Sequence, residues 1–116
     1  PLQALIDGAE RYFAAMAGQG RARLLLLEAP AVLPPAQLLA LHERAGASAL
    51  RDGLGAALAP AALAGAVIDA LAAQLSAAFD RAALAIARGE PAEPQRQAMR
   101  WLLTQLVQGA GAAPRA

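Results

Sequence analysis

Cysteine is absent from this sequence of 116 residues, and so are lysine and asparagine. Without cysteine the chain can form no disulfide, no thiolate nucleophile and no cysteine-ligated metal site. Aromatic residues make up only 3% of the chain, and β-branched residues are scarce. Few residues that favour strands are therefore available, whereas the abundant alanine, leucine, glutamine and arginine favour helices. The composition predicts an all-α protein.

A concentration of charge of one sign is also missing. The 10 basic residues are all arginine and are distributed among 9 acidic residues, so the formal net charge is only +1. This pattern does not indicate a nucleic-acid-binding patch. The longest uncharged run, residues 53–68, is shorter than the about 20 apolar residues of a membrane-spanning helix. The sequence begins with neither a methionine nor a secretory signal, so we expect a fragment that lies in the cytoplasm and not in a membrane.

Motifs for catalysis are missing as well. The chain has no Gly-rich phosphate loop, no nucleophile elbow and no metal-ligand spacing. Its one histidine, His42, is next to Glu43, but adjacent helical positions do not face each other. Each carboxylate lies near an arginine or a helix end, as Glu10 does beside Arg11, and we interpret all of them as solvated surface. We predict no enzyme, no catalytic residue, no metal and no cofactor; an enzyme would need His42 and a carboxylate to converge in a cleft.

Apolar residues recur at helical spacing along most of the chain. They predict helices over 2–17, 20–29, 34–45, 48–58 and 95–108, with glycines or prolines near several of their ends. Two interpretations of the region between 59 and 88 remain open. Either Pro60 begins one long helix that reaches Arg88, or residues 64–69 form a connector and Asp69 caps a helix from Ala70. The chain is thus predicted to be one domain of five to six helices over residues 1–109, followed by a disordered tail over 110–116.

Four consecutive leucines at 24–27 have neither helical nor strand periodicity. A strand would need partners, and no other segment alternates apolar and polar residues. A helix that is apolar on every side is normally enclosed by other helices. Pro30 biases Ala29 away from helical angles, so the helix should stop or kink there. We therefore predict that the leucines form the central rod of a helical bundle.

Two groups of residues are candidates for binding. Tyr12, Phe13 and Met16 lie near the end of the first helix and His42 near the middle of the third, where together they would line a small cavity. The alternative is that Phe13 and Met16 belong to the core and Tyr12 to its solvated edge. Trp101, the only tryptophan, is on a polar helix edge near an alanine-lined helix. Such an aromatic residue either anchors a protein interface or covers the edge of the chain's own core.

Four stretches in this order resemble the C-terminal half of TetR-type transcriptional regulators: RLLLLEAPAVL (23–33), ALRDGLGAAL (49–58), AAFDRAALAIARGEP (77–91) and RWLLTQLVQG (100–109). The resemblance covers most of residues 20–109. It implies an all-α domain that binds a small apolar or amphipathic effector among its helices. It also implies a homodimer in which the last two long helices and their symmetry mates form a four-helix bundle. The interface residues would be Phe79, Ala83, Ile86, Trp101, Leu102 and Gln105.

In that family a separate N-terminal helix-turn-helix domain contacts DNA. No such segment precedes Pro1, so we expect this chain to reach DNA only through a missing N-terminal domain. The stretch PAVLPP (30–35) departs from the family pattern, as does the short link before Asp69. We predict the ligand-sensing and dimerisation domain of a TetR-like transcriptional repressor. The alternative is a helical-bundle protein-interaction module that has no small-molecule ligand.

Overall fold

Helices occupy most of the chain in the computed structural model. The structure describes residues 1–18, 20–44 and 47–112, without the side chains of 42–44 and 47. The elements are α1 (Leu2–Met16), α2 (Arg21–Arg23), the π-helical turn η1 (Leu24–Glu28), α3 (Ala29–Val32), α4 (Pro35–Arg44), α5 (Ala47–Ala57), the 3₁₀ turn η2 (Ala59–Ala61), α6 (Gly65–Ala87) and α7 (Ala92–Gly111). No strand occurs over the described residues, where α2, η1 and α3 run on as one segment. The predicted all-α fold is confirmed.

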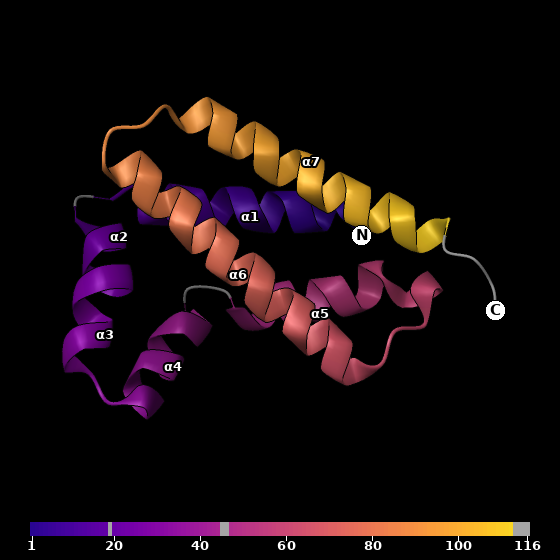
Figure 1. Cartoon of the computed structure of the whole chain (residues 1–116), viewed down its shortest axis with the longest axis horizontal. Helices are drawn as coiled ribbons and strands as arrows, with labels where there is room; N and C mark the ends of the chain where they lie inside the picture. Colours follow the sequence, from indigo (N-terminus) through magenta and orange to yellow (C-terminus); the bar gives the residue numbers. More distant parts are fainter. Residues whose placement is uncertain (19, 45–46, 113–116) are drawn as a thin grey trace.

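Helix α1 lies at the centre of the arrangement. Its apolar stripe is buried at Leu5, Ala9, Phe13 and Met16, as the helical spacing predicts. These residues pack with side chains of α5, α6 and α7 in one hydrophobic cluster. In Figure 1, α1 lies behind the α6–α7 pair, and α2 to α4 form a corner beside it. Helix α1 therefore provides one buried face that α5, α6 and α7 share, while its other side faces solvent.

The leucine run is helical, but the prediction that it forms an enclosed central rod is wrong. Leu24 is 59% exposed and Leu27 is 42% exposed, while Leu25 and Leu26 are only half-buried. The segment lies at the edge of the domain, where neighbouring helices contact one side of it (Figure 1). An apolar composition favours burial, but it does not determine how many neighbours a helix has.

Pro30 widens this helix and does not end it. The amide of Ala29 donates to the carbonyl of Leu24, which makes the turn before the proline π-helical. In an α-helix the ring of Pro30 would clash with the carbonyl of Leu26, and Pro30 has no N–H to donate to it. The wider turn accommodates the ring, and the helix continues to Val32 instead of stopping near Ala29.

The region between 59 and 88 follows neither of the two predicted interpretations. Pro60 lies within the 3₁₀ turn η2, and Ala62 then adopts a left-handed conformation with φ 53°. Helix α6 begins at Gly65, so Asp69 lies inside the helix and does not cap it. Helix α7 also exceeds its prediction, because it extends to Gly111 and buries Ala110. Residues 113–116 of the predicted tail lie outside the described residues.

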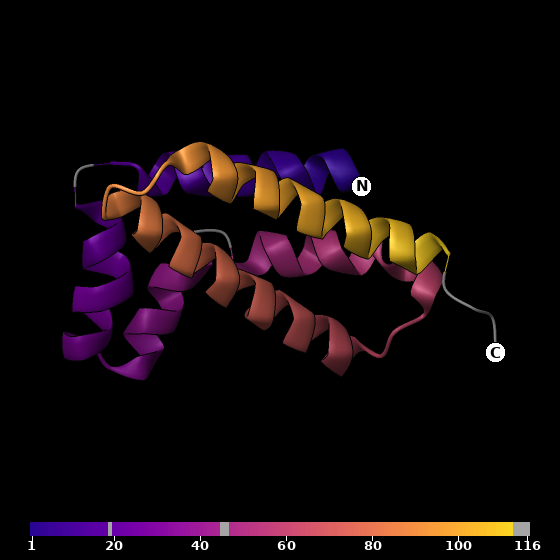
Figure 2. The same cartoon turned by 45° about the horizontal axis from the view of Figure 1, so that its top comes forward.

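The helices form a thin slab of 46 × 33 × 17 Å (Figure 2). Since one helix with its side chains is about 10 Å across, the slab is roughly two helices thick. Its accessible surface is 7221 Å². A monomer of 11.8 kDa normally exposes about 5,900 Å². The single chain therefore leaves an unusually large area open to solvent.

Within the described ranges α6 is long and apolar enough to cross a membrane, by length and composition alone. Core helices of globular proteins pass the same test. Helix α6 packs against α1, α2, α5 and α7 and contributes Leu75, Phe79 and Leu84 to the core. Even so, only 28% of its most apolar window is buried within the single chain, so much of its apolar surface faces outward.

The contrast between the enclosed core and the exposed leucine turn can be measured. Leu103 is fully buried, so Leu103→Ala should lower the free energy of unfolding by about 2–5 kcal/mol. Leu24→Ala should lower it by less than about 1 kcal/mol, because that side chain is mostly in solvent. Urea unfolding followed by far-UV circular dichroism gives both values. Equal losses in the two variants would contradict the surface position of the leucine turn.

Candidate functional site

A cavity of about 460 Å³ lies between α1, η1, α5 and α6. Its apolar lining includes Leu5, Met16, Leu25, Leu26, Leu50 and Phe79. Over the described residues its polar lining consists of four side chains: Arg11, Tyr12, Ser76 and Asp80. A mostly apolar cavity of this size with a few polar groups is typical of small-molecule binding sites.

Two glycines keep this region open. Gly8 of α1 lines the cavity, and a Cβ atom there would meet only the Arg11 guanidinium, at 3.8 Å. Gly53 of α5 lies closer to α1, because a Cβ atom would be 2.9 Å from Cδ2 of Leu5. Gly53 therefore permits the approach of the two helices. Gly8 leaves space that a larger side chain would occupy.

A hydrogen bond joins α1 to α6 across one end of the cavity. The hydroxyl of Tyr12 donates to Oδ1 of Asp80, and both side chains are partly buried. Burial and the carboxylate together raise the pKa of Tyr12 well above its ordinary value, so the phenol remains protonated and remains a donor. The expectation that Asp80 is solvated surface beside Arg81 is wrong. Asp80 lines the cavity and is bonded to a residue 68 positions away in the sequence.

The four predicted ligand-binding residues do not all lie in one place. Tyr12 and Met16 line the larger cavity. Phe13 is buried against Phe79, with ring centroids 6.0 Å apart, and lines a second cavity of about 390 Å³ near the α1–α2 turn. His42 belongs to α4, but its side chain lies outside the described residues. Gly8, Ser76 and Asp80 also line the larger cavity, although no sequence pattern marks them as binding residues.

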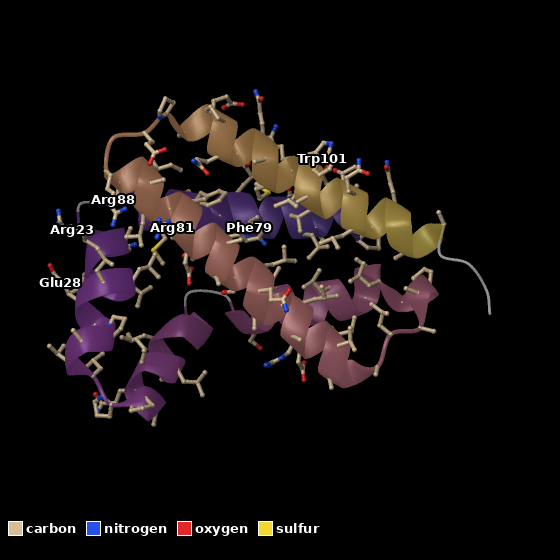
Figure 3. All side chains as sticks on the ribbon, in the orientation of Figure 1. Arg23, Glu28, Phe79, Arg81, Arg88 and Trp101 are labelled. Carbon is tan, nitrogen blue, oxygen red and sulfur yellow. The ribbon has the colours of Figure 1, made fainter. Side chains whose placement is uncertain are left out.

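The six predicted interface residues fall into two groups. Phe79 and Ala83 are buried within the single chain, and Ile86 is half-buried beside the smaller cavity. Trp101, Leu102 and Gln105 are exposed on α7, with Trp101 63% exposed (Figure 3). Phe79 and Ala83 are thus core residues of this chain, whereas the three α7 residues are free to meet another surface.

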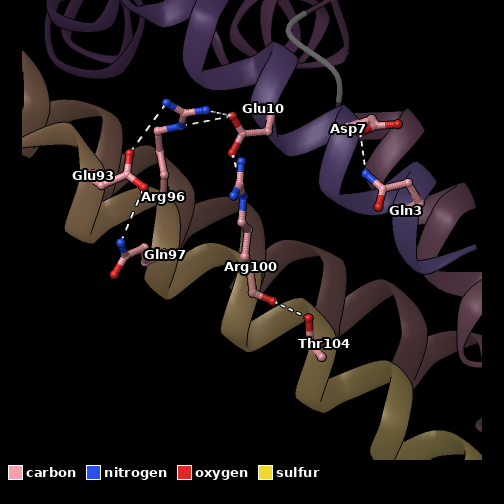
Figure 4. Close-up of polar contacts among 8 residues, drawn as sticks. All are labelled: Gln3, Asp7, Glu10, Glu93, Arg96, Gln97, Arg100 and Thr104. Carbon is pink, nitrogen blue, oxygen red and sulfur yellow. Dashed lines mark hydrogen bonds and ion pairs between the residues drawn. The ribbon is translucent and has the colours of Figure 1, made fainter.

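A cluster of charges joins α1 to α7 (Figure 4). Nε and Nη2 of Arg96 both donate to Oε2 of Glu10, the former over 3.0 Å. Nε of Arg100 lies 3.4 Å from Oε1 of the same carboxylate. Glu93 adds a longer ion pair to Arg96, at 3.8 Å. The prediction that Glu10 is a solvated neighbour of Arg11 is therefore wrong, and no local pattern reveals partners that lie 86 residues away.

Comparisons with known proteins complete these observations. Residues 2–110 match the family described as tetracyclin repressor-like, C-terminal domain. No curated protein matches the chain, and no solved structure does.

The charge cluster makes stability depend on pH. The hydrogen bond from Arg96, together with the charges of Arg96 and Arg100, lowers the pKa of Glu10 despite its partial burial. A carboxylate with a lowered pKa in the folded state stabilises the fold above its unfolded pKa, and this contribution is lost as the pH falls through the folded pKa. Glu10→Gln should therefore lower the melting temperature at pH 7, and the difference from the wild type should begin to shrink as the pH falls below the unfolded pKa of about 4.3 and vanish only below the lowered folded pKa.

Thermal unfolding measured across this pH range tests the prediction. Glu28→Gln is the matched control, because Glu28 is exposed and forms no ion pair within the described part of the chain. This variant should melt at nearly the wild-type temperature at pH 7. A Glu10→Gln variant with an unchanged melting temperature at neutral pH would contradict the proposed contribution of the cluster.

Proposed function

Because the chain belongs to the family of tetracyclin repressor-like C-terminal domains, we propose that it senses a small effector and forms a homodimer within a TetR-like transcriptional repressor. In this role it is a regulatory domain of a cytoplasmic protein and not an enzyme. DNA would be bound through a separate N-terminal helix-turn-helix domain. The effector would be a small apolar or amphipathic molecule.

The observation that carries the ligand-sensing proposal is the cavity of about 460 Å³. It lies beside the central helix α1, whose residues from Ala4 to Met16 supply one wall. Residues of α5, α6 and η1 supply the others. A ligand bound there would contact elements from both halves of the chain, so it can favour one arrangement of them over another.

The mechanism that we propose is a shift between two arrangements of the helices. A ligand changes their populations only if it binds one arrangement more tightly than the other. Helix α1 contacts the cavity through Tyr12 and contacts α7 through Glu10. A change at the cavity can therefore reach α7. In a dimer, a movement of α7 would alter the spacing of two DNA-reading domains, which must match half-sites about one DNA turn apart.

Exposed area supports the dimerisation proposal. The chain exposes about 1,300 Å² more than a typical monomer of its mass, and a standard interface covers about 800 Å² on each partner. Trp101 and Leu102 place large apolar groups on the open side of α7. We assign the interface to this side of α7, with Gln105 beside it and Ile86 of α6 at its edge. Phe79 and Ala83 would support it from the interior of each chain.

The alternative function, a protein-interaction module without a ligand, is favoured by a different observation. Leu24, Leu27, Val32 and Leu39 are exposed on the corner formed by α2 to α4. Exposed apolar groups of this kind often mark an interaction surface. The two functions differ in their need for the cavity, so filling the cavity distinguishes them.

Gly8→Leu is the variant that fills the cavity. We expect it to weaken the binding of decan-1-ol, used as an uncharged probe, by about tenfold or more, because the new side chain occupies the space beside α1. Loss of a helical glycine should also stabilise the fold by about 0.5–1 kcal/mol. Isothermal titration calorimetry measures the binding, and thermal unfolding measures the stability.

Gly55→Leu is the matched control, because Gly55 is a glycine of α5 with open space around its Cα and no place in the cavity lining. This variant should bind decan-1-ol as the wild type does. If the wild type does not bind decan-1-ol saturably, or if Gly8→Leu binds it equally well, the ligand-sensing function fails and the interaction module is favoured.

Dimerisation is tested at Trp101. We expect the wild-type chain to sediment at twice its mass of 11.8 kDa, and Trp101→Glu to sediment as a monomer, because a buried unpaired carboxylate opposes association. Leu39→Glu is the matched control, since it introduces the same charge at an exposed apolar residue of α4. Analytical ultracentrifugation gives the masses. Monomeric wild-type protein at high concentration, or loss of the dimer in the Leu39 variant alone, would contradict the interface on α7.

A further inference from the structure

We propose that the cavity between α1, η1, α5 and α6 selects amphipathic amines, with the ammonium group bound by the carboxylate of Asp80 and the hydrocarbon part lying against the leucines. This inference rests on the proposed ligand-sensing function and names the chemical class of the ligand. It is carried by the distribution of charge and of hydrogen-bonding groups around the cavity.

Among the lining side chains that the structure describes, two carry a charge, Arg11 and Asp80. Arg11 is exposed, so its guanidinium is largely hydrated. Asp80 is half-buried on α6, next to Phe79 and one turn from Ser76. A less hydrated charge interacts more strongly with a ligand, because solvent screens it less. The carboxylate is therefore the stronger of the two charged groups toward a bound molecule.

Asp80 has binding capacity that the protein leaves unused within the described residues. A carboxylate offers about four lone-pair positions, and the hydroxyl of Tyr12 occupies one of them. No arginine of the described chain forms an ion pair with Asp80. The ion pairs that the described residues form all involve Glu10 or Glu93. Tyr12 stays neutral, because burial and Asp80 raise its pKa, so it orients the carboxylate without cancelling its charge.

A cationic donor suits this arrangement better than a neutral or an anionic group. An ammonium group forms charge-assisted hydrogen bonds with the carboxylate, which are about twice as strong as bonds between neutral groups. An alcohol gains only a neutral hydrogen bond there, and a carboxylate ligand is repelled. The remaining lining, which includes Leu5, Leu25, Leu26 and Leu50, suits an alkyl or aryl group.

Three probes with the same alkyl chain test this inference: decylamine, decan-1-ol and decanoate at pH 7, the alcohol below its solubility limit and the two ions below their micelle-forming concentrations. We expect wild-type protein to bind decylamine about tenfold more tightly than decan-1-ol, and decanoate more weakly than either. Isothermal titration calorimetry measures the three affinities. Equal affinities for amine and alcohol, or a preference for decanoate through Arg11, would overturn the inference.

Asp80→Asn removes the charge and keeps an oxygen that accepts the Tyr12 hydroxyl bond. It should lower the affinity for decylamine about tenfold and leave the affinity for decan-1-ol unchanged. Asp69→Asn is the matched control, because Asp69 is exposed on the same helix and does not line the cavity. It should keep the preference for the amine, as should Tyr12→Phe, which retains the charge of Asp80. An amine preference that survives in Asp80→Asn would also overturn the inference.

The probes separate this inference from the proposed function. If none of the three binds saturably, the cavity is not a ligand site, and both fail. If decan-1-ol binds and is excluded by Gly8→Leu, the ligand-sensing function stands. The absence of a preference for decylamine would then refute only the assignment to amines.

Discussion

The burial of one stripe of α1 is the constraint on which the rest of the domain depends. Leu5, Ala9, Phe13 and Met16 supply the surface that α5, α6 and α7 share. The other sides of the same helix carry two polar links, from Glu10 to α7 and from Tyr12 to α6. Helix α5 and helix α6 also pack directly against each other, but α1 contacts α5, α6 and α7. The position of α1 therefore determines both the charge cluster and the shape of the cavity.

Much of the fold could be predicted from the sequence, because amphipathic helices have a period that local residues reveal. The predicted first helix ends within one residue of the observed end at Met16, and the helical spacing of its apolar residues agrees with its buried stripe. The leucine run has no period, so its sequence fixes neither a buried side nor a number of neighbours. Phe79 is a second example, because it is predicted in a dimer interface but is buried in the core of its own chain. An apolar side chain on a helix can face its own core or another chain, and only the arrangement of the helices distinguishes the two.

The candidate site was less predictable than the fold. Tyr12 and Met16 were selected because they lie together near the end of one helix, and they do line the cavity. Asp80 and Glu10 were assigned to solvent because an arginine is next to each in the sequence. Their actual partners lie 68 and 86 residues away, so no local pattern identifies them. Gly8 could have been recognised as unusual, since a glycine inside a helix weakens it unless space or contact requires it.

The π-helical turn that contains Leu25 and Leu26 also bears on how related chains can vary in length. Such a turn holds about one residue more than an α-helical turn for a similar advance along the axis. Where Pro30 is also replaced, so that its ring no longer requires the wider turn, deletion of one leucine would restore an ordinary turn and preserve the orientation of Ala22 before it and Ala29 after it, both of which are buried. The wall of the cavity would lose a side chain in the process. A change of one residue in the length of this segment, coupled to the presence or absence of Pro30, can therefore reshape the cavity while the flanking helices keep their places.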